Sequence, residues 1–185
     1  THATADLSFA LMMVVARRIT EGVKAVENGE WKTWHPLHFL GQEVHGSTLG
    51  IVGLGRIGLE VAKRATGFDM RVLYSDVVRH EDAEAQLPLT FVDMDELLRE
   101  SDFVSVHVNL SPETHHLFND ERFAKMKPNA VLVNAARGPV VDPAALYRAL
   151  KDGKIGGAAL DVTDPEPISM DDPLLTLDNC VIVPH

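Results

Sequence analysis

Three residues in the second half of the chain could together do acid–base chemistry. They are a fixed cation, Arg137, a carboxylate, Glu166, and an imidazole, His185, each a few residues beyond a short apolar run. A guanidinium can hold a carboxylate and polarise a carbonyl, and an imidazole beside a carboxylate can donate a proton. Reduction of a 2-keto acid needs such a set. Taken singly, each residue has a plain alternative: a surface cation, a loop charge and a frayed end.

A glycine-rich turn earlier in the chain has the spacing of a dinucleotide-binding turn. The strand-like run Leu49-Gly50-Ile51-Val52 leads directly into Gly53-Leu54-Gly55-Arg56-Ile57-Gly58, and a helical pattern follows. Gly53 would allow the tight turn, Gly55 would let the backbone approach a pyrophosphate, and Gly58 would let helix and strand pack closely. The alternative is a tight turn with no ligand.

An acidic residue follows the glycines at the distance expected for ribose recognition. Asp76 ends the next predicted strand, where a carboxylate can accept hydrogen bonds from the adenosine ribose hydroxyls. Such a carboxylate also repels a 2′-phosphate, so NAD is favoured over NADP. Arg79 is close enough in sequence to soften that preference, and a solvated surface aspartate is the alternative for Asp76.

The elements that must position these residues alternate between strand and helix. Strands are expected at residues 48–52, 70–75, 103–108, 130–134, 157–162 and 181–183, and helices at 57–66, 93–100, 120–126 and 142–151. This alternation predicts an α/β fold, a Rossmann-type doubly wound parallel sheet with flanking helices in a single domain over residues 1–185. Apolar spacing further predicts one long helix over residues 4–28, followed by an extended arm.

Composition narrows the class of protein. The 185 residues are 45% hydrophobic, which suffices for a globular core. A formal net charge of −10 without a basic run argues against a nucleic-acid partner, and no apolar stretch is long enough to span a bilayer. The single Cys180 cannot form an internal disulfide, so a reducing, cytoplasmic compartment is expected. The histidine clusters at 35–45 and 115–116 lack zinc-site spacing, so no metal is expected.

Together with the glycine turn, the order and spacing of Arg137, Glu166 and His185 strongly resemble the D-isomer-specific 2-hydroxyacid dehydrogenases across essentially the whole chain. In that family the cofactor domain is inserted into a substrate-binding domain. The resemblance implies that this chain is the NAD-binding domain, residues 1–185, with the substrate-binding domain absent from it. It also implies hydride transfer between NADH and a small 2-keto acid, giving the D-2-hydroxy acid. Formate-oxidising members have glutamine at the position of Glu166, so hydroxyacid chemistry is expected.

The resemblance also implies a role for each site residue. Arg137 would bind the substrate carboxylate and carbonyl, His185 would donate the proton during reduction, and Glu166 would stabilise the charged form of His185. The cofactor contacts that it implies, beyond Gly53, Gly55, Gly58 and Asp76, are Thr4 near the nicotinamide, Arg56 and Ile57 on the pyrophosphate, Val108 in the loop after its strand, Ala135 beside Arg137, and Asp161 on the nicotinamide carboxamide.

Within the family, residues 29–36 and 40–46 look most like glyoxylate and hydroxypyruvate reductases, which implies glyoxylate or hydroxypyruvate as substrate. In those enzymes this arm packs on the partner subunit. A homodimer through the first helix and the Trp31–Leu40 arm is therefore expected. The isolated chain is expected to bind cofactor but to be inactive, because the resemblance assigns half of the active-site cleft to the missing domain.

A function of another class stays open. The same family contains transcriptional corepressors that use cofactor binding to control assembly, so the alternative is a dinucleotide-sensing binding module without physiological catalysis. Arg137, Glu166 and His185 fit both functions. The reductase-like arm and the absence of added peptide-binding sequence favour the enzyme.

Overall fold

The computed structural model describes all 185 residues, and strands alternate with helices from residue 48 onward. The strands are β1 (Thr48–Val52), β2 (Arg71–Ser75), β3 (Leu89–Phe91), β4 (Phe103–Val106), β5 (Val131–Asn134), β6 (Gly157–Leu160) and β7 (Cys180–Ile182). The α-helices are α1 (His2–Ala16), α2 (Ile19–Glu27), α3 (Arg56–Ala65), α4 (Glu81–Glu84), α5 (Met94–Glu100), α6 (Asp120–Lys125) and α7 (Pro143–Lys151). Short 3₁₀ helices are η1 (Thr66–Phe68), η2 (Gly138–Val140) and η3 (Pro173–Thr176).

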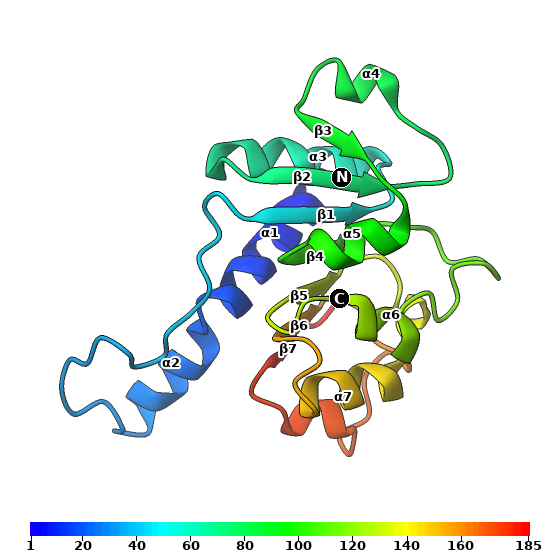
Figure 1. Cartoon of the computed structure of the whole chain (residues 1–185). Coiled ribbons are helices and arrows are strands. Elements are labelled where there is room, and N and C mark those ends of the chain that lie inside the picture. The colour runs from blue at the N-terminus through cyan, green and yellow to red at the C-terminus, as the bar shows by residue number, and fades with distance from the viewer.

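All seven strands pair in parallel in the order β3-β2-β1-β4-β5-β6-β7 (Figure 1). The order reverses between β1 and β4, as in the predicted Rossmann-type doubly wound sheet. The last residues of six strands pair across the sheet in one row: Ser75, Val52, Val106, Asn134, Leu160 and Ile182. The loops that follow these residues therefore begin at one edge of the sheet.

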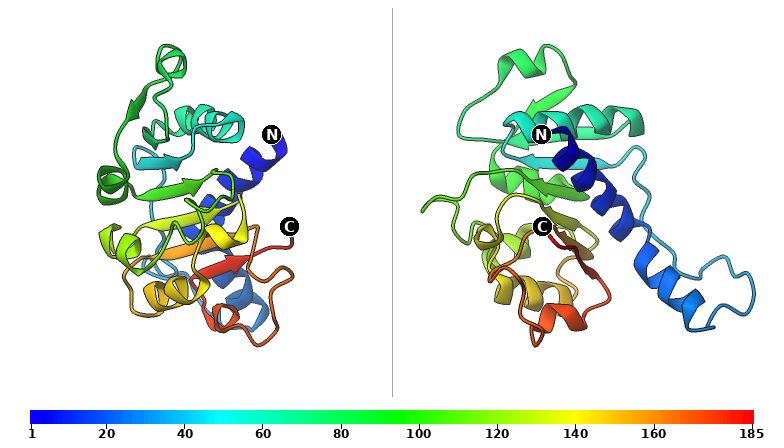
Figure 2. Two further views of the ribbon diagram at one scale, coloured as in Figure 1. Left: turned by 90° about the vertical axis from the view of Figure 1, so that its right-hand side faces the viewer. Right: turned by 180° about the vertical axis from the view of Figure 1, so that it is seen from behind.

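Helices cover both faces of the sheet, and each face has its own hydrophobic cluster. α1 and α3 pack together on one face, where α1 crosses the sheet diagonally, and α5, α6 and α7 lie on the other (Figure 2). Along β1, Ile51 joins the α1 and α3 cluster, whereas a side chain at Gly50 would collide with Leu97 of α5. Burial on both faces explains why the strands are almost continuously apolar.

The predicted long helix over residues 4–28 is wrong, because the chain breaks it into α1 and α2. Arg18, between the two helices, adopts a left-handed backbone with φ 52°. The backbone N–H of Gln42 donates to the carbonyl oxygen of Ala16 at 2.7 Å, where a continuous helix would place its own N–H four residues later. A contact from the returning arm thus ends α1, and α2 projects from the body together with the arm (Figure 1).

The remaining predicted strands and helices are confirmed within one or two residues at their ends. Asp93 and Asp142 cap α5 and α7 by accepting backbone N–H bonds, and Gly153 lies just beyond α7 with φ 68°. The edge strand β3 and the 3₁₀ helices were not predicted. No helix combines the length and the apolar character that crossing a bilayer would require.

Candidate active site

The loop after β5 is fixed by the last side chain of that strand. Nδ2 of the buried Asn134 donates to the carbonyl oxygen of Arg137 at 3.0 Å, and its Oδ1 accepts from the N–H of Ala136 at 3.1 Å. Arg137 itself is exposed, with Nη1 donating to the Ala136 carbonyl at 2.7 Å. Sequence reasoning gave Asn134 no role, although an amide at the end of a buried strand is a signal that could have found it.

Glu166 and His185 meet at the ends of the next two strands. Oε1 of Glu166 lies 2.6 Å from Nδ1 of His185, and Oε2 accepts from the backbone N–H of Thr163 at 3.3 Å. The hydrogen bond to His185 is the main cause that lowers the pKa of Glu166, and the charge of Arg137 lowers it further. The two side chains are 40% and 49% exposed. The three residues singled out from the sequence are therefore neighbours at one edge of the sheet.

This pairing leaves one ring nitrogen available. When the imidazole is protonated, its Nδ1–H donates to Glu166 and its Nε2–H remains free to transfer a proton. A cleft of about 370 Å³ opens beside the pair, lined by both residues together with Asp161, Ile168 and Leu175. Asp161 is buried directly after β6, and its backbone N–H donates to the carbonyl oxygen of Asn134 at 3.0 Å. The arrangement places a ring nitrogen that can donate a proton beside an open cleft.

The glycine turn leaves room for a phosphate group. Gly53 has φ +89° and packs on the carbonyl oxygen of His107, 2.8 Å from where a Cβ would stand, and a Cβ at Gly58 would overlap the backbone of Gly53. Gly55, by contrast, faces open space, with no atom within 4 Å of an added Cβ. Since α3 starts at Arg56 without a side-chain cap, its first N–H groups are free for an anion. The residues present therefore fit the pyrophosphate of a dinucleotide.

Asp76 lies against this turn and is no solvated surface residue. Its Oδ2 accepts from the N–H of Leu54 at 2.7 Å, and its Oδ1 accepts from the N–H of Val77 at 2.6 Å. Oδ2 is also 3.3 Å from Nε2 of His80. On the other side of the turn, the side chain of Val108 lies 3.0 Å from the Cβ position of Gly53. Asp76 and Val108 thus flank the glycines, as a dinucleotide-binding crevice requires.

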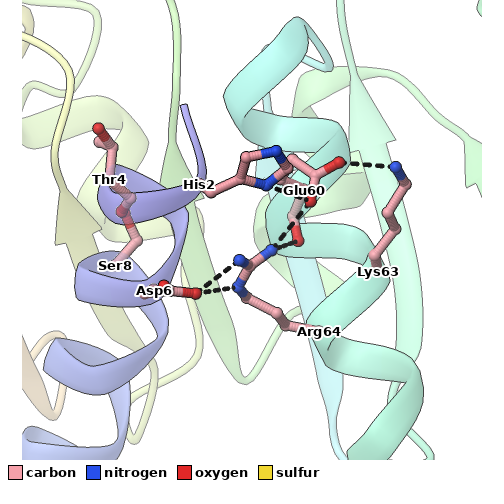
Figure 3. Close-up of polar contacts among 7 residues, drawn as sticks. All are labelled: His2, Thr4, Asp6, Ser8, Glu60, Lys63 and Arg64. Carbon is pink, nitrogen blue, oxygen red and sulfur yellow. Dashed lines mark hydrogen bonds and ion pairs between the residues drawn. The ribbon is translucent and has the colours of Figure 1, made fainter.

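The N-terminal turn of α1 is tied to α3 by charged side chains (Figure 3). Arg64 of α3 donates to Asp6 at 2.7 Å and to Glu60 at 3.1 Å. The carboxylate of Glu60 also lies 3.1 Å from Nδ1 of His2 and accepts from Nζ of Lys63 at 2.6 Å. Lys63 is the main cause that lowers the pKa of Glu60 to about 2. Thr4 lies on the other side of this turn (Figure 3). Its position is therefore fixed relative to the helix that starts at the glycines.

The other candidate residues are placed less closely. Ala135 is buried between Asn134 and the Arg137 turn, whereas the side chain of Arg56 is exposed. Sequence reasoning missed His107, a residue beside the glycine turn whose burial lowers its pKa to about 4 and keeps the ring neutral. No three His, Cys, Asp or Glu side chains converge in a way that could hold a metal ion.

Comparisons with known proteins identify the family of the chain. Residues 9–185 match the family model for the D-isomer specific 2-hydroxyacid dehydrogenase, NAD binding domain. A glyoxylate reductase from Korarchaeum cryptofilum is 55% identical over 186 residues, an alignment that covers 100% of this chain and 56% of the relative. The chain thus spans little more than half the length of the curated relatives that it matches.

Solved structures show the same fold. The TT0316 protein from Thermus thermophilus matches with a TM-score of 0.94 and 51% identity, covering 100% of this chain and 58% of that one. A D-lactate dehydrogenase with NAD⁺ from Lactobacillus jensenii matches with a TM-score of 0.87 and 32% identity, covering 99% and 58%. The chain belongs to the NAD-binding domain family of the D-isomer-specific 2-hydroxyacid dehydrogenases.

Proposed function

We propose that this chain is the cofactor-binding and proton-donating domain of a reductase that transfers a hydride from NADH to a small 2-keto acid. The observation that carries the proposal is the contact of 2.6 Å between Glu166 and His185, at the same sheet edge as Arg137. The names of several relatives, glyoxylate reductases and a glyoxylate/hydroxypyruvate reductase B, support glyoxylate or hydroxypyruvate as substrate, and the description of the family supports the D-2-hydroxy acid as product. Residues 1–185 would form the NAD-binding domain, and the rest of the full-length protein would supply the substrate-binding domain.

The cofactor would lie along the row of strand ends. The N–H groups at the start of α3, with Arg56 and Ile57, would hold the pyrophosphate above Gly55. Asp76 would accept hydrogen bonds from the adenosine ribose, which favours NAD. The remaining contacts proposed for the cofactor are made by Gly53, Gly58, Val108, Ala135, Thr4 and Asp161. When bound, the nicotinamide supplies the hydride.

The residues of this chain would handle the substrate and the proton. Arg137 would bind the substrate carboxylate and polarise the keto oxygen. His185 would give the proton on Nε2 to that oxygen as the hydride reaches the keto carbon, which yields a hydroxyl group. Glu166 would hold Nδ1 and favour the protonated ring before transfer. The roles of cation, acid and carboxylate are thus divided among three adjacent loops.

We propose that a second copy of the chain covers α2 and the arm. Both carry exposed apolar side chains: Ile19, Val23, Val26, Trp31, Trp34, Leu37 and Leu40. Of these, Val26, Trp31 and Trp34 line a cleft of about 590 Å³ between α2 and the arm. α1 contributes less, because its inner face is buried on the sheet. A patch of this kind marks an interface, and symmetric dimers are the commonest assembly. A reducing, cytoplasmic location is also proposed, since Cys180 is an unpaired thiol.

Substituting the glycines should separate cofactor binding from folding. Gly55→Ala should weaken NADH binding at least about tenfold, because the new methyl group occupies the space left for the pyrophosphate, while the free energy of unfolding falls by only about 1 kcal/mol or less. Gly58→Ala should cost about 1–3 kcal/mol of stability through overlap with Gly53. Calorimetric titration and urea unfolding measure the two effects. Gly67→Ala, where an added Cβ meets nothing, is the control. Unweakened NADH binding by Gly55→Ala would contradict the proposal.

Activity should require both the full-length protein and His185. Full-length protein should oxidise NADH with glyoxylate or hydroxypyruvate, and His185→Ala should lower kcat by about 10²- to 10⁴-fold, the usual contribution of general acid catalysis. The 185-residue chain alone should turn over negligibly, because positioning of bound reactants supplies roughly 7–11 kcal/mol. A spectrophotometric assay that includes pyruvate and phosphohydroxypyruvate tests substrate choice. Robust turnover by the isolated chain would refute the two-domain cleft, and an inactive full-length protein that binds NADH would favour the binding-module function.

Light scattering should detect the dimer. At a protein concentration of tens of micromolar, about where a moderately stable interface forms, the measured mass should be twice the monomer mass of 20.3 kDa. Val23→Glu should give monomers, because it buries a charge at the contact. Val77→Glu, which places the same charge at a residue that is 97% exposed outside α2 and the arm, should stay dimeric. A monomeric wild type would be evidence against this surface.

A further inference from the structure

Arg79 is the first cationic residue after Asp76 in the sequence, and its guanidinium is paired with a carboxylate. Its Nε donates to Oε1 of Glu84 at 3.0 Å, and its Nη2 donates to Oε2 at 2.7 Å. This two-pronged pair raises the pKa of Arg79 and lowers the pKa of Glu84. Parallel N–H···O bonds are the strongest form of an arginine–carboxylate contact. Arg79 is therefore committed to α4.

A buried tyrosine holds the carboxylate of Glu84 in place. The hydroxyl of Tyr74 donates to Oε1 of Glu84 at 2.7 Å and accepts from the backbone N–H of His80 at 2.8 Å. The side chain of Glu84 is 17% exposed, compared with 56% for Arg79. The carboxylate is thus held in place by the tyrosine, and the more exposed guanidinium pairs with it. Glu81 also attracts Arg79, but through its charge alone.

The same loop reaches the proposed ribose site. Nε2 of His80 lies 3.3 Å from Oδ2 of Asp76, so the loop that carries Arg79 contacts that carboxylate. In dinucleotide-binding domains, an arginine near this position accommodates the 2′-phosphate of NADP. The sequence offers such an arginine, and α4 holds it in another contact.

We propose that Glu84 is a specificity-determining residue for the cofactor, because it withholds from the adenosine ribose site the arginine that could neutralise a 2′-phosphate. Asp76 disfavours NADP by repulsion, and Glu84 disfavours it by engaging Arg79. Both carboxylates therefore favour NAD over NADP. This inference rests on the proposed function, since it takes the adenosine ribose to bind at Asp76.

Binding measurements on the 185-residue chain test the inference without catalysis. Glu84→Gln keeps an acceptor for Tyr74 but removes the charge that holds Arg79. Calorimetry should then show NADPH and 2′,5′-ADP binding about fivefold tighter, the upper end for an exposed ion pair, while NADH and 5′-AMP stay within about twofold. Asp120→Asn is the matched control, because it removes the two-pronged pair with Arg148, at 3.1 and 2.7 Å, elsewhere on the surface. Asp120→Asn should leave the affinities for all four ligands unchanged.

Variants of Arg79 decide whether the gain comes through this side chain. Arg79→Gln in the wild-type background should leave NADPH affinity unchanged, and in the Glu84→Gln background it should abolish the gain. A Glu84→Gln protein without tighter NADPH binding, or a gain that survives in the double variant, would overturn the inference. If Glu84→Gln does not fold, weaker NADPH binding by Arg79→Gln alone would overturn it equally. A wild type that binds no NADH would instead refute the proposed function.

Discussion

The parallel register of the sheet is the constraint on which the site depends. Asn134, Leu160 and Ile182 end three adjacent strands in one row, and each following loop needs only a few residues to present its functional side chain. The loops also pack tightly on one another, since a side chain at Gly138 would overlap the backbone of Thr163. A shift of one residue in any of these strands would exchange the side chains that face the two hydrophobic clusters and move the loop away from its neighbours. Packing of the two hydrophobic clusters and placement of the site therefore have the same structural cause.

The side chains proposed to do the chemistry are exposed to solvent, although the backbone that carries them is held by hydrogen bonds and packing. The glycine turn, the Asn134 amide and the pairing of α1 with α3 fix the main chain, whereas Glu166 and His185 are 40% and 49% exposed. Their interaction is screened in this state, and exclusion of water on closure of a substrate-binding domain would strengthen it. Under the proposed function, this contrast would explain why the domain binds a cofactor and needs a second domain for turnover.

Much of this arrangement could be predicted from the sequence. Parallel strands that are buried on both faces appear in it as continuous apolar runs, and the spacing of the glycines indicates a turn that needs glycine. The positions of β1, β4, β5 and β6 followed from such runs. The placing of Arg137, Glu166 and His185 at one edge of the sheet followed from their positions after strands. The break between α1 and α2 could not be predicted, since it depends on Gln42 capturing the Ala16 carbonyl from a distant part of the chain. The ion pair between Arg79 and Glu84 could not be predicted for a related reason. Sequence spacing shows which residues are near one another, but only side-chain geometry shows which of them pair.

The proposed function makes Glu166 and His185 one proton-donating unit, and kcat of the full-length Glu166→Gln variant tests this most directly. Oε1 of Glu166 lies 2.6 Å from Nδ1 of His185, and this hydrogen bond is the main cause that lowers the pKa of Glu166. Glu166→Gln removes the charged acceptor at Nδ1, so the reduction of glyoxylate by NADH should have a lower kcat in this variant, with NADH affinity unchanged. A kcat equal to that of the wild type would contradict the pairing.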